Sequence, residues 1–269
     1  MRACFCRCVD EVLEGDVASA FALIRPPGHH ASSKESKGFC FFNNIAIAAR
    51  HAQQKHNVNR VLIVDWDVHF GDGTAEIFAE DDSVLYISLH RFAEGFYPHT
   101  PQAAVNYVGT GKGAGYTVNI PWNEEGHNDD DYLLAFSKII MPIAYEFNPE
   151  LVLVSSGFDA CAGENVQLGD CNLSPYGFSR MIHLLGALAN GKVIAALEGG
   201  YEIENLRLCS EAVLSTMVAN AVIEAPVVAP YKPKSFNQKS LETIQSVINS
   251  HSSHWKCLKP FAVIADESQ

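Results

Sequence analysis

The sequence has few features of a nucleic-acid-binding, secreted or membrane-spanning protein. Its 19 lysines and arginines are outnumbered by 31 aspartates and glutamates, which gives a formal net charge of -12. Such a surface repels a phosphate backbone, so direct nucleic-acid binding is not expected. Residues 1–17 contain acids and no long apolar stretch, unlike a secretory signal, and no later apolar run is long enough to cross a bilayer. We therefore expect an intracellular protein without a membrane anchor.

Paired cysteines are also missing. None of the eight cysteines forms the C-x-x-C spacing of a structural zinc site. Only Cys4, Cys6 and Cys8 are clustered, and alternate positions near a chain end more often reflect packing or chance than a metal site. We expect reduced thiols, as in intracellular proteins.

Short apolar runs alternate with longer stretches of helical period, a pattern typical of a parallel sheet with crossover helices. With 269 residues, 48% of them apolar, the chain can bury one sizeable core. The sequence therefore predicts a single-domain α/β fold with a mostly parallel sheet. The expected strands are Ala20–Ile24, Arg60–Trp66, Val84–Ser88, Leu151–Ser155 and Val193–Leu197, with Tyr116–Pro121 as a further candidate. The expected helices are Cys40–His56, Asp131–Glu146 bent at Pro142, Ser174–Asn190 closed by Gly191, and Asn205–Asn220.

The last part of the chain has a different pattern. Three prolines at residues 225–233 indicate an extended connection, and apolar residues at helical spacing follow over residues 241–248. We therefore divide the chain into a main domain at residues 1–222 and a connection with a final helix and tail at residues 223–269.

The strongest chemical signal follows the apolar run at residues 61–64. Because strand residues alternate between faces, Asp65, Asp67 and His69 share one face. A second expected strand is followed by Asp159, and sites gather where parallel strands end. An isolated D-x-H is more often a helix cap or surface pair, but the neighbouring motifs favour a site. Two carboxylates and an imidazole give zinc three protein ligands and leave a fourth coordination position open for water or substrate, as a catalytic zinc site requires. We therefore assign Asp67, His69 and Asp159 as the zinc ligands.

Two anionic ligands would leave a metal-bound water only weakly acidic, so a protein base is needed. His29 and His30 follow the first expected strand and would reach the same edge of the sheet. Asp65 and Asp72 lie next to the metal ligands in sequence and can orient the two imidazoles. A His-His pair on its own would equally suit a solvated loop.

An aromatic residue follows the strand at residues 193–197. The intervening glycines allow a tight turn that presents Tyr201, whose protonated phenol can donate a hydrogen bond to an oxyanion. A tyrosine after two glycines is more often only a turn residue. Phe39 and Tyr97 can wall an apolar channel around a four-carbon stem, although each alone is more often core.

These motifs resemble the histone deacetylase family. Three motifs have the sequence typical of class II: Arg-Pro-Pro-Gly-His-His at residues 25–30, Val-Asp-Trp-Asp-Val-His at residues 64–69 and Gly-Phe-Asp-Ala at residues 157–160. The match runs from about Cys6 to about Asn220. The tail is similar to that of class IIb members. The resemblance implies an arginase-like α/β fold and zinc-dependent hydrolysis of acetyl-lysine in histones or other proteins, with a role in chromatin and transcription.

The resemblance also implies roles for individual residues. The zinc ligands are the three chosen above. His30 would act as general base and then general acid, with His29 as an electrostatic partner and with Asp65 and Asp72 orienting the pair. Tyr201 would polarise the amide carbonyl. Class IIa relatives carry histidine at that position and are weakly active, so the tyrosine favours a competent enzyme.

Two further sets of residues are implied by the resemblance. Family members hold a structural K⁺, here through the strand around Asp65, Asp67 and His69 and a turn at Ser88 and Leu89. The substrate channel would be formed by Gly38, Phe39, Tyr97 and Leu168.

The sequence departs from the family at two places. Phe70 stands where members repeat a histidine, and we expect changed packing there because that histidine is not a ligand. The resemblance also starts inside the usual domain, so we expect the family's amino-terminal segment, with a first strand and an acidic rim loop, to be missing before Met1. That loss would weaken stability and substrate affinity.

Two other functions stay open. A polyamine deacetylase of the class IIb type would carry an acid at a gatekeeping position, where this chain has Leu168, so a peptide substrate is favoured. The other open function is that of a catalytically silent scaffold or acetyl-lysine reader. The presence of Tyr201 and His30 argues against it. Corepressor or scaffold partners are compatible with either, and the compartment can be nucleus or cytoplasm.

Overall fold

Six parallel strands form one sheet in the order β1-β6-β5-β2-β3-β4. The computed structural model describes residues 2–221 and 237–263. The strands are β1 (Ala20–Ala22), β2 (Val61–Asp65), β3 (Val84–Arg91), β4 (Thr117–Trp122), β5 (Leu151–Ser156) and β6 (Val193–Leu197). The predicted fold class and all six predicted strands are confirmed.

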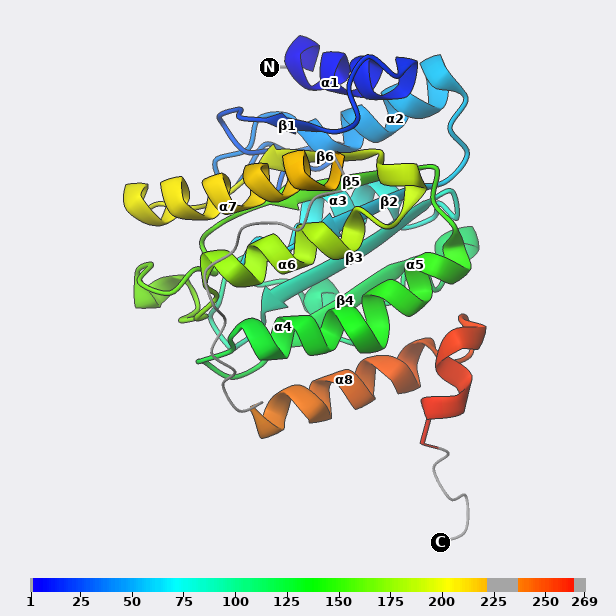
Figure 1. Cartoon of the computed structure of the whole chain (residues 1–269). Coiled ribbons are helices and arrows are strands. Elements are labelled where there is room, and N and C mark those ends of the chain that lie inside the picture. Colours follow the sequence, from blue (N-terminus) through cyan, green and yellow to red (C-terminus); the bar gives the residue numbers. More distant parts are fainter. Residues whose placement is uncertain (1, 222–236, 264–269) are drawn as a thin grey trace, which may run out of the picture.

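Helices cover both faces of the sheet (Figure 1). They are α1 (Arg2–Glu14), α2 (Asn44–His56), α3 (Asp72–Phe78), α4 (Asp129–Ala135), α5 (Met141–Phe147), α6 (Pro175–Leu185), α7 (Ile203–Ala221) and α8 (Gln238–His251). Every residue of β2 to β6 is buried, which explains the continuous apolar runs in β2, β5 and β6.

The central strand β2 shows how the two layers are made. Val61 and Ile63 face a core shared with α1, α2 and α3, whereas Leu62 and Val64 face a larger core shared with α4 to α8. All four side chains are fully buried. The buried strand fixes the position of the polar residues that follow it.

The helix predictions need three corrections. The helix that begins at Ser174 ends at Leu185, because Ala189 and Asn190 have positive φ angles that a helix does not allow. The helix predicted with a bend at Pro142 is interrupted by a π-helical turn at Phe136–Ile140, which accommodates the missing proline N–H. Helices α1 and α3 were not predicted.

The final helix packs on the main core. Ile244, Val247 and Ile248 of α8 are buried, and the Trp255 indole donates a hydrogen bond of 2.9 Å to the carbonyl of Gly115. The predicted connection at residues 225–233 lies outside the described residues, and the division at residue 222 stays a prediction.

Within the part of the chain that the structure describes, no helix is both long and apolar enough to cross a membrane.

Candidate active site

Two acids and a histidine meet where β2 and β5 end. Asp67 and His69 follow β2, and Asp159 follows β5, its neighbour in the sheet. His69 Nδ1 lies 3.1 Å from Asp67 Oδ1 and 3.2 Å from Asp159 Oδ2. One ligand atom from each residue lies within 4.8 Å of the others. The structure thus brings the three predicted ligands together.

Backbone groups orient the two carboxylates. Asp67 Oδ2 accepts a hydrogen bond of 2.8 Å from the N–H of Gly199, and Asp159 Oδ1 accepts one of 2.9 Å from the N–H of Val68. The remaining oxygen of Asp159 is buried and makes no hydrogen bond of normal geometry, although it lies near the His69 ring. A buried oxygen of this kind beside an imidazole suits a divalent cation such as Zn²⁺.

The pKa shifts of His69 and Asp159 indicate a site that favours a bound positive charge. Burial alone would lower the pKa of His69, but hydrogen bonds to Asp159 and Asp67 outweigh burial and raise it to about 9. Burial and repulsion by Asp67 raise the pKa of Asp159. A proton or a metal ion is therefore needed to balance the two carboxylates.

Only glycine fits at position 199. A Cβ atom there would overlap the Asp159 carboxylate and crowd that of Asp67. The glycine after β6 therefore allows the chain to pass directly over the ligand set, and it also supplies the N–H that holds Asp67.

The tandem histidines lie beside the ligand set, each held by an acid. His29 Nδ1 lies 3.0 Å from Asp65 Oδ2, and His30 Nδ1 lies 2.9 Å from Asp72 Oδ1. The two ring centroids are 4.0 Å apart. Asp65 and Asp72 thus lie where they can orient the two imidazoles, and the structure adds the pairing, His29 with Asp65 and His30 with Asp72.

The two rings differ in charge. Burial, with repulsion from His29, lowers the pKa of His30 to about 4, so this ring is neutral near pH 7. Burial also opposes the charged form of His29, but Asp67 and Asp65 outweigh it and raise its pKa well above the usual value. One cationic and one neutral imidazole therefore lie side by side.

Three supporting residues were missed from the sequence. Glu198 accepts hydrogen bonds from the N–H groups of Gly28 (2.6 Å) and His29 (3.1 Å), and burial raises its pKa to about 7. The Tyr86 hydroxyl donates to Asp65 Oδ2 at 2.9 Å. The Lys37 ammonium lies 2.5 Å from Asp72 Oδ2. Glu198 could have been found from its place in the motif before Tyr201, whereas Tyr86 lies within a predicted strand and Lys37 within a loop, and neither belongs to a chemical motif.

A cavity of about 670 Å³ opens over the histidines and the ligand set. Its lining includes all the residues predicted for the channel, namely Gly38, Phe39, Tyr97 and Leu168, together with His29, His30, Asp67, His69 and Tyr201. The rings of Phe39 and Tyr201 lie 6.5 Å apart, centroid to centroid. Burial, then the charges of Asp67 and Asp159, raise the pKa of Tyr201, so its phenol is protonated and can donate a hydrogen bond.

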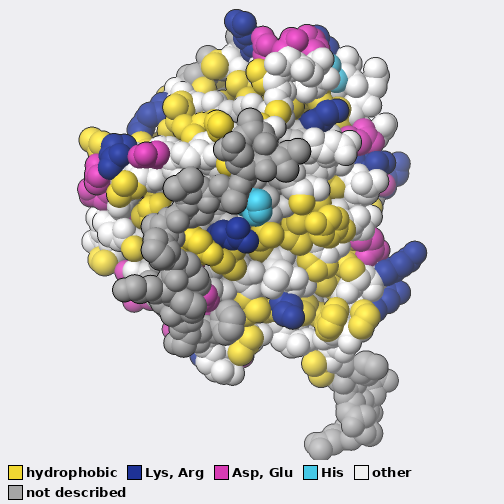
Figure 2. Space-filling view, viewed as in Figure 1, with side chains coloured by type: hydrophobic (Ala, Val, Ile, Leu, Met, Phe, Trp, Pro, Cys, Tyr) yellow, Lys and Arg dark blue, Asp and Glu magenta, His cyan; other side chains and the backbone are white. Residues whose placement is uncertain are grey.

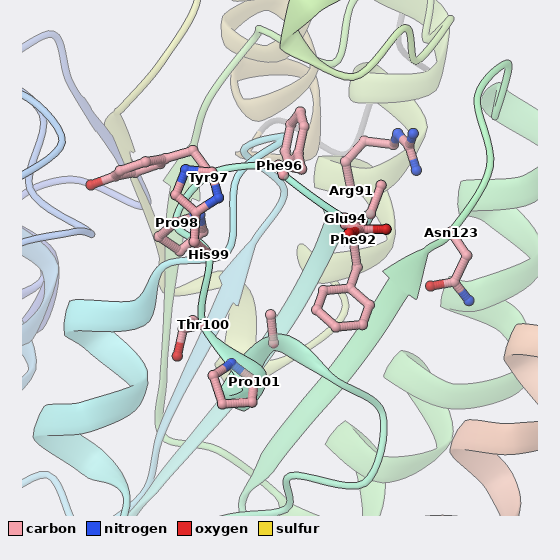
Figure 3. A pocket seen from close by; sticks show the side chains of 13 residues that line it. Arg91, Phe92, Glu94, Phe96, Tyr97, Pro98, His99, Thr100, Pro101 and Asn123 are labelled. Atoms are coloured by element: carbon pink, nitrogen blue, oxygen red, sulfur yellow. The ribbon is translucent and has the colours of Figure 1, made fainter.

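A second cavity of about 560 Å³ adjoins the first, and Tyr97 lines both. It lies between the loop after β3 and Asn123, and Figure 3 shows the Tyr97 phenol directed away from Phe92 and Asn123. The buried Arg91 donates to the carbonyls of Trp122 (2.6 Å) and Gly169 (2.9 Å). Tyr97 therefore separates the cavities, and Arg91 fixes the loop next to Leu168.

The proposed potassium residues need one correction. Ser88 and Leu89 lie inside β3 and not in a turn, because β3 continues to Arg91. Ser88 pairs in register with Asp65 of β2, and its hydroxyl lies 2.8 Å from His90 Nδ1. The binding of K⁺ by Asp65, Asp67, His69, Ser88 and Leu89 stays a prediction.

Phe70 packs in the core beside this strand. It is fully buried, and its ring lies 4.8 Å from the His90 ring and 6.4 Å from that of Tyr86, centroid to centroid. The residue therefore fills core space beside β3.

Residues 1–217 match the family described as Histone deacetylase domain. The chain belongs to the histone deacetylase domain family. It is 45% identical to human Polyamine deacetylase HDAC10 over 258 residues, which cover 96% of this chain and 38% of the relative. It is 42% identical to Histone deacetylase 6 of Caenorhabditis elegans over 262 residues (95% and 27%) and 42% identical to Histone deacetylase HDA1 of Candida albicans over 251 residues (92% and 29%).

The fold of this deacetylase domain is also similar to a solved one. The crystal structure of the HDA15 HD domain matches with a TM-score of 0.85 and 41% identity, over 95% of this chain and 69% of that chain. The predicted resemblance to class II of the family is confirmed, and the family is a zinc-dependent hydrolase family. The chain spans between 27% and 38% of the length of the three curated relatives.

Proposed function

We propose that this chain hydrolyses the acetyl amide of N6-acetyl-lysine in histones or other proteins. The observation that carries the proposal is the meeting, at one cavity, of a neutral His30, a protonated Tyr201 and the residues Asp67 and His69, with Asp159 beside His69 to complete the ligand set. Each group supplies a different part of amide hydrolysis, namely proton transfer, oxyanion stabilisation and metal binding.

Asp67, His69 and Asp159 would hold the zinc ion, which when bound polarises the acyl oxygen and makes water more acidic. The neutral His30 is anchored through Nδ1 by Asp72, so its Nε2 is left to take the proton from the attacking water. The same nitrogen then returns that proton to the leaving lysine amine. Acetate and lysine are the products.

Two neighbours assist His30. The cationic His29 lies 4.0 Å away, centroid to centroid, and stabilises negative charge that develops over the ligand set. The Tyr201 phenol donates a hydrogen bond to the oxygen of the tetrahedral intermediate. Because the phenol stays protonated, this donor is present across the physiological pH range.

The shape of the cavity supports a lysine side chain as substrate. Gly38, Phe39 and Tyr97 line it with little polar surface, which suits a four-carbon stem. Leu168 adds an apolar group where the polyamine-specific relatives would place an acid, and this favours an acetylated protein over a polyamine.

An acetylated polyamine is the second candidate, and two observations favour it. The human relative at 45% identity is called a polyamine deacetylase, and Glu164 and Glu202 line the cavity. The Glu164 carboxylate accepts hydrogen bonds from the backbone N–H groups of Tyr201 and Glu202. Those hydrogen bonds fix the position of the Glu164 carboxylate but leave its negative charge, so Glu164 and Glu202 can both attract a second amine.

The two substrates can be compared directly. The zinc-loaded chain is given an acetyl-lysine peptide and monoacetylated spermidine, and kcat/KM is measured for each by acetate release. The proposal predicts the higher kcat/KM for the peptide. A higher value for spermidine would transfer the assignment to a polyamine deacetylase, and no turnover of either by a zinc-loaded, folded chain would favour a silent scaffold or acetyl-lysine reader. His30→Ala serves as the inactive control.

The cellular setting belongs to the same proposal. An acetylated protein is the expected partner, with corepressor or scaffold proteins as further partners, in the nucleus or the cytoplasm.

A further inference from the structure

A second group of metal-ligating side chains lies between α1 and α2, helices that carry none of the catalytic residues. Asp10 of α1 places its Oδ1 atom 2.7 Å from Nε2 of His51 and 2.7 Å from Nε2 of His56, both on α2. The side chains are 25%, 26% and 13% exposed in that order. A cation could therefore enter from solvent, and water could complete its coordination.

We propose that Asp10, His51 and His56 form a second metal site, which binds a borderline divalent cation such as Zn²⁺ and joins α1 to α2. Two imidazoles and one carboxylate are a ligand set that zinc accepts. One ligand atom from each residue lies within 4.8 Å of the others, as in the catalytic set. Among the residues that the structure describes, these are the two groups that meet this condition.

The ligand atoms need only a small movement to bind. Around tetrahedral zinc, ligands at 2.0–2.1 Å from the metal lie about 3.3 Å from one another. The Asp10 oxygen is 2.7 Å from each imidazole nitrogen, so each separation must open by roughly 0.6 Å. Both histidines approach the same oxygen through Nε2, and one cation can replace the two shared hydrogen bonds.

One positive charge opposes the cation. The Lys55 ammonium lies 2.9 Å from Asp10 Oδ2 and 3.3 Å from Glu14 Oε1. Because Lys55 is about half exposed, it can stay with Glu14 and leave Asp10 to the metal. Figure 2 shows acidic and basic side chains together over α1, and Arg7 pairs with Glu11 on that helix at 3.1 Å.

The cysteines of α1 do not form this site. Cys4, Cys6 and Cys8 lie at alternate positions of a helix, and two residues turn a helix by about 200°, so Cys6 faces away from the other two. This explains why alternate cysteines on α1 do not make a three-thiolate site.

Binding would stabilise the edge of the molecule. Helix α1 packs on α2 and on β1, the strand at one edge of the sheet, and it buries Phe5, Val9 and Val12. A metal held by both helices would therefore slow the opening of α1 and raise the thermal stability of the chain.

Zinc counting on the full chain tests the proposal. The metal-free chain is dialysed against Zn²⁺ and the bound metal is measured by elemental analysis. We expect two equivalents for the parent, one for His51→Gln with His56→Gln, and one for Asp159→Ala. His254→Gln, which changes an exposed histidine outside both groups, should keep two. One equivalent in the parent, or two in the His51 and His56 variant, would overturn the proposal.

Two further readouts separate metal binding from a structural role of the histidines. In the Asp159→Ala background, Zn²⁺ should slow amide hydrogen exchange in α1, and the added His51 and His56 substitutions should abolish that effect. Lys55→Gln should tighten zinc binding at this site by roughly fivefold, since a like charge near the metal is removed. If zinc leaves exchange in α1 unchanged and Lys55→Gln leaves the affinity unchanged, the cluster is only an ion pair between two helices.

Discussion

The role of Tyr201 gives the sharpest prediction for catalysis. Removing its hydroxyl in Tyr201→Phe should lower kcat while the aromatic ring is kept. Loss of one donor to an oxyanion costs about 10²- to 10³-fold in kcat, or about 2.7–4 kcal/mol. Tyr201 is 45% exposed, so water can replace part of the lost hydrogen bond, and we expect the lower end, about 10²-fold.

The assay is acetate release from an acetyl-lysine peptide by zinc-loaded protein. Zinc content and KM should stay near the parent values, because Tyr201 is not in the ligand set. Tyr145→Phe, at an exposed tyrosine of α5, is the matched control and should keep full activity. Full activity of Tyr201→Phe would refute the oxyanion role, and loss of zinc would show that the residue instead maintains the metal site.

Other consequences follow from burial and close packing. Asp159→Ala should lose the catalytic zinc as well as activity, measured as metal content and acetate release; retained zinc would contradict the ligand assignment. Gly199→Ala should also lose zinc, because its Cβ overlaps the Asp159 carboxylate; a fully loaded variant would show that the loop can move away. Burial lowers the pKa of His90 and of His251 to about 4, so the unfolded chain takes up their protons first as the pH falls. The free energy of unfolding should therefore fall by roughly 2 kcal/mol per histidine between pH 7 and 5. His251→Asn should make this free energy, measured by urea titration, less dependent on pH. An unchanged pH dependence would contradict a neutral, buried His251.

The sheet and the clustering of the three candidate metal ligands could be predicted from the sequence for one physical reason. Strands covered on both faces are continuous apolar runs, so their ends are visible, and parallel strands bring those ends to one edge. The polar residues Asp67, His69 and Asp159 come directly after two such runs. Their meeting in space follows from the sheet order, in which β2 and β5 are neighbours.

Other features depend on tertiary contacts and were missed. Helix α3 has only seven residues, too few for a clear periodic pattern, and α1 has little apolar character beyond the residues it buries. Lys37 and Tyr86 reach Asp72 and Asp65 from distant segments, so no local pattern marks them. The end of α6 at Leu185 depends on positive φ angles at Ala189 and Asn190, which are seen only in the structure.

Zinc content and chelator-sensitive acetate release, measured together on this chain with an acetyl-lysine peptide, decide whether the chain is a zinc-dependent deacetylase. We expect turnover that a chelator abolishes and added Zn²⁺ restores, together with loss of both the catalytic zinc and turnover in Asp159→Ala. Turnover that persists after the zinc is removed, or a folded and zinc-loaded chain that releases no acetate, would contradict this expectation.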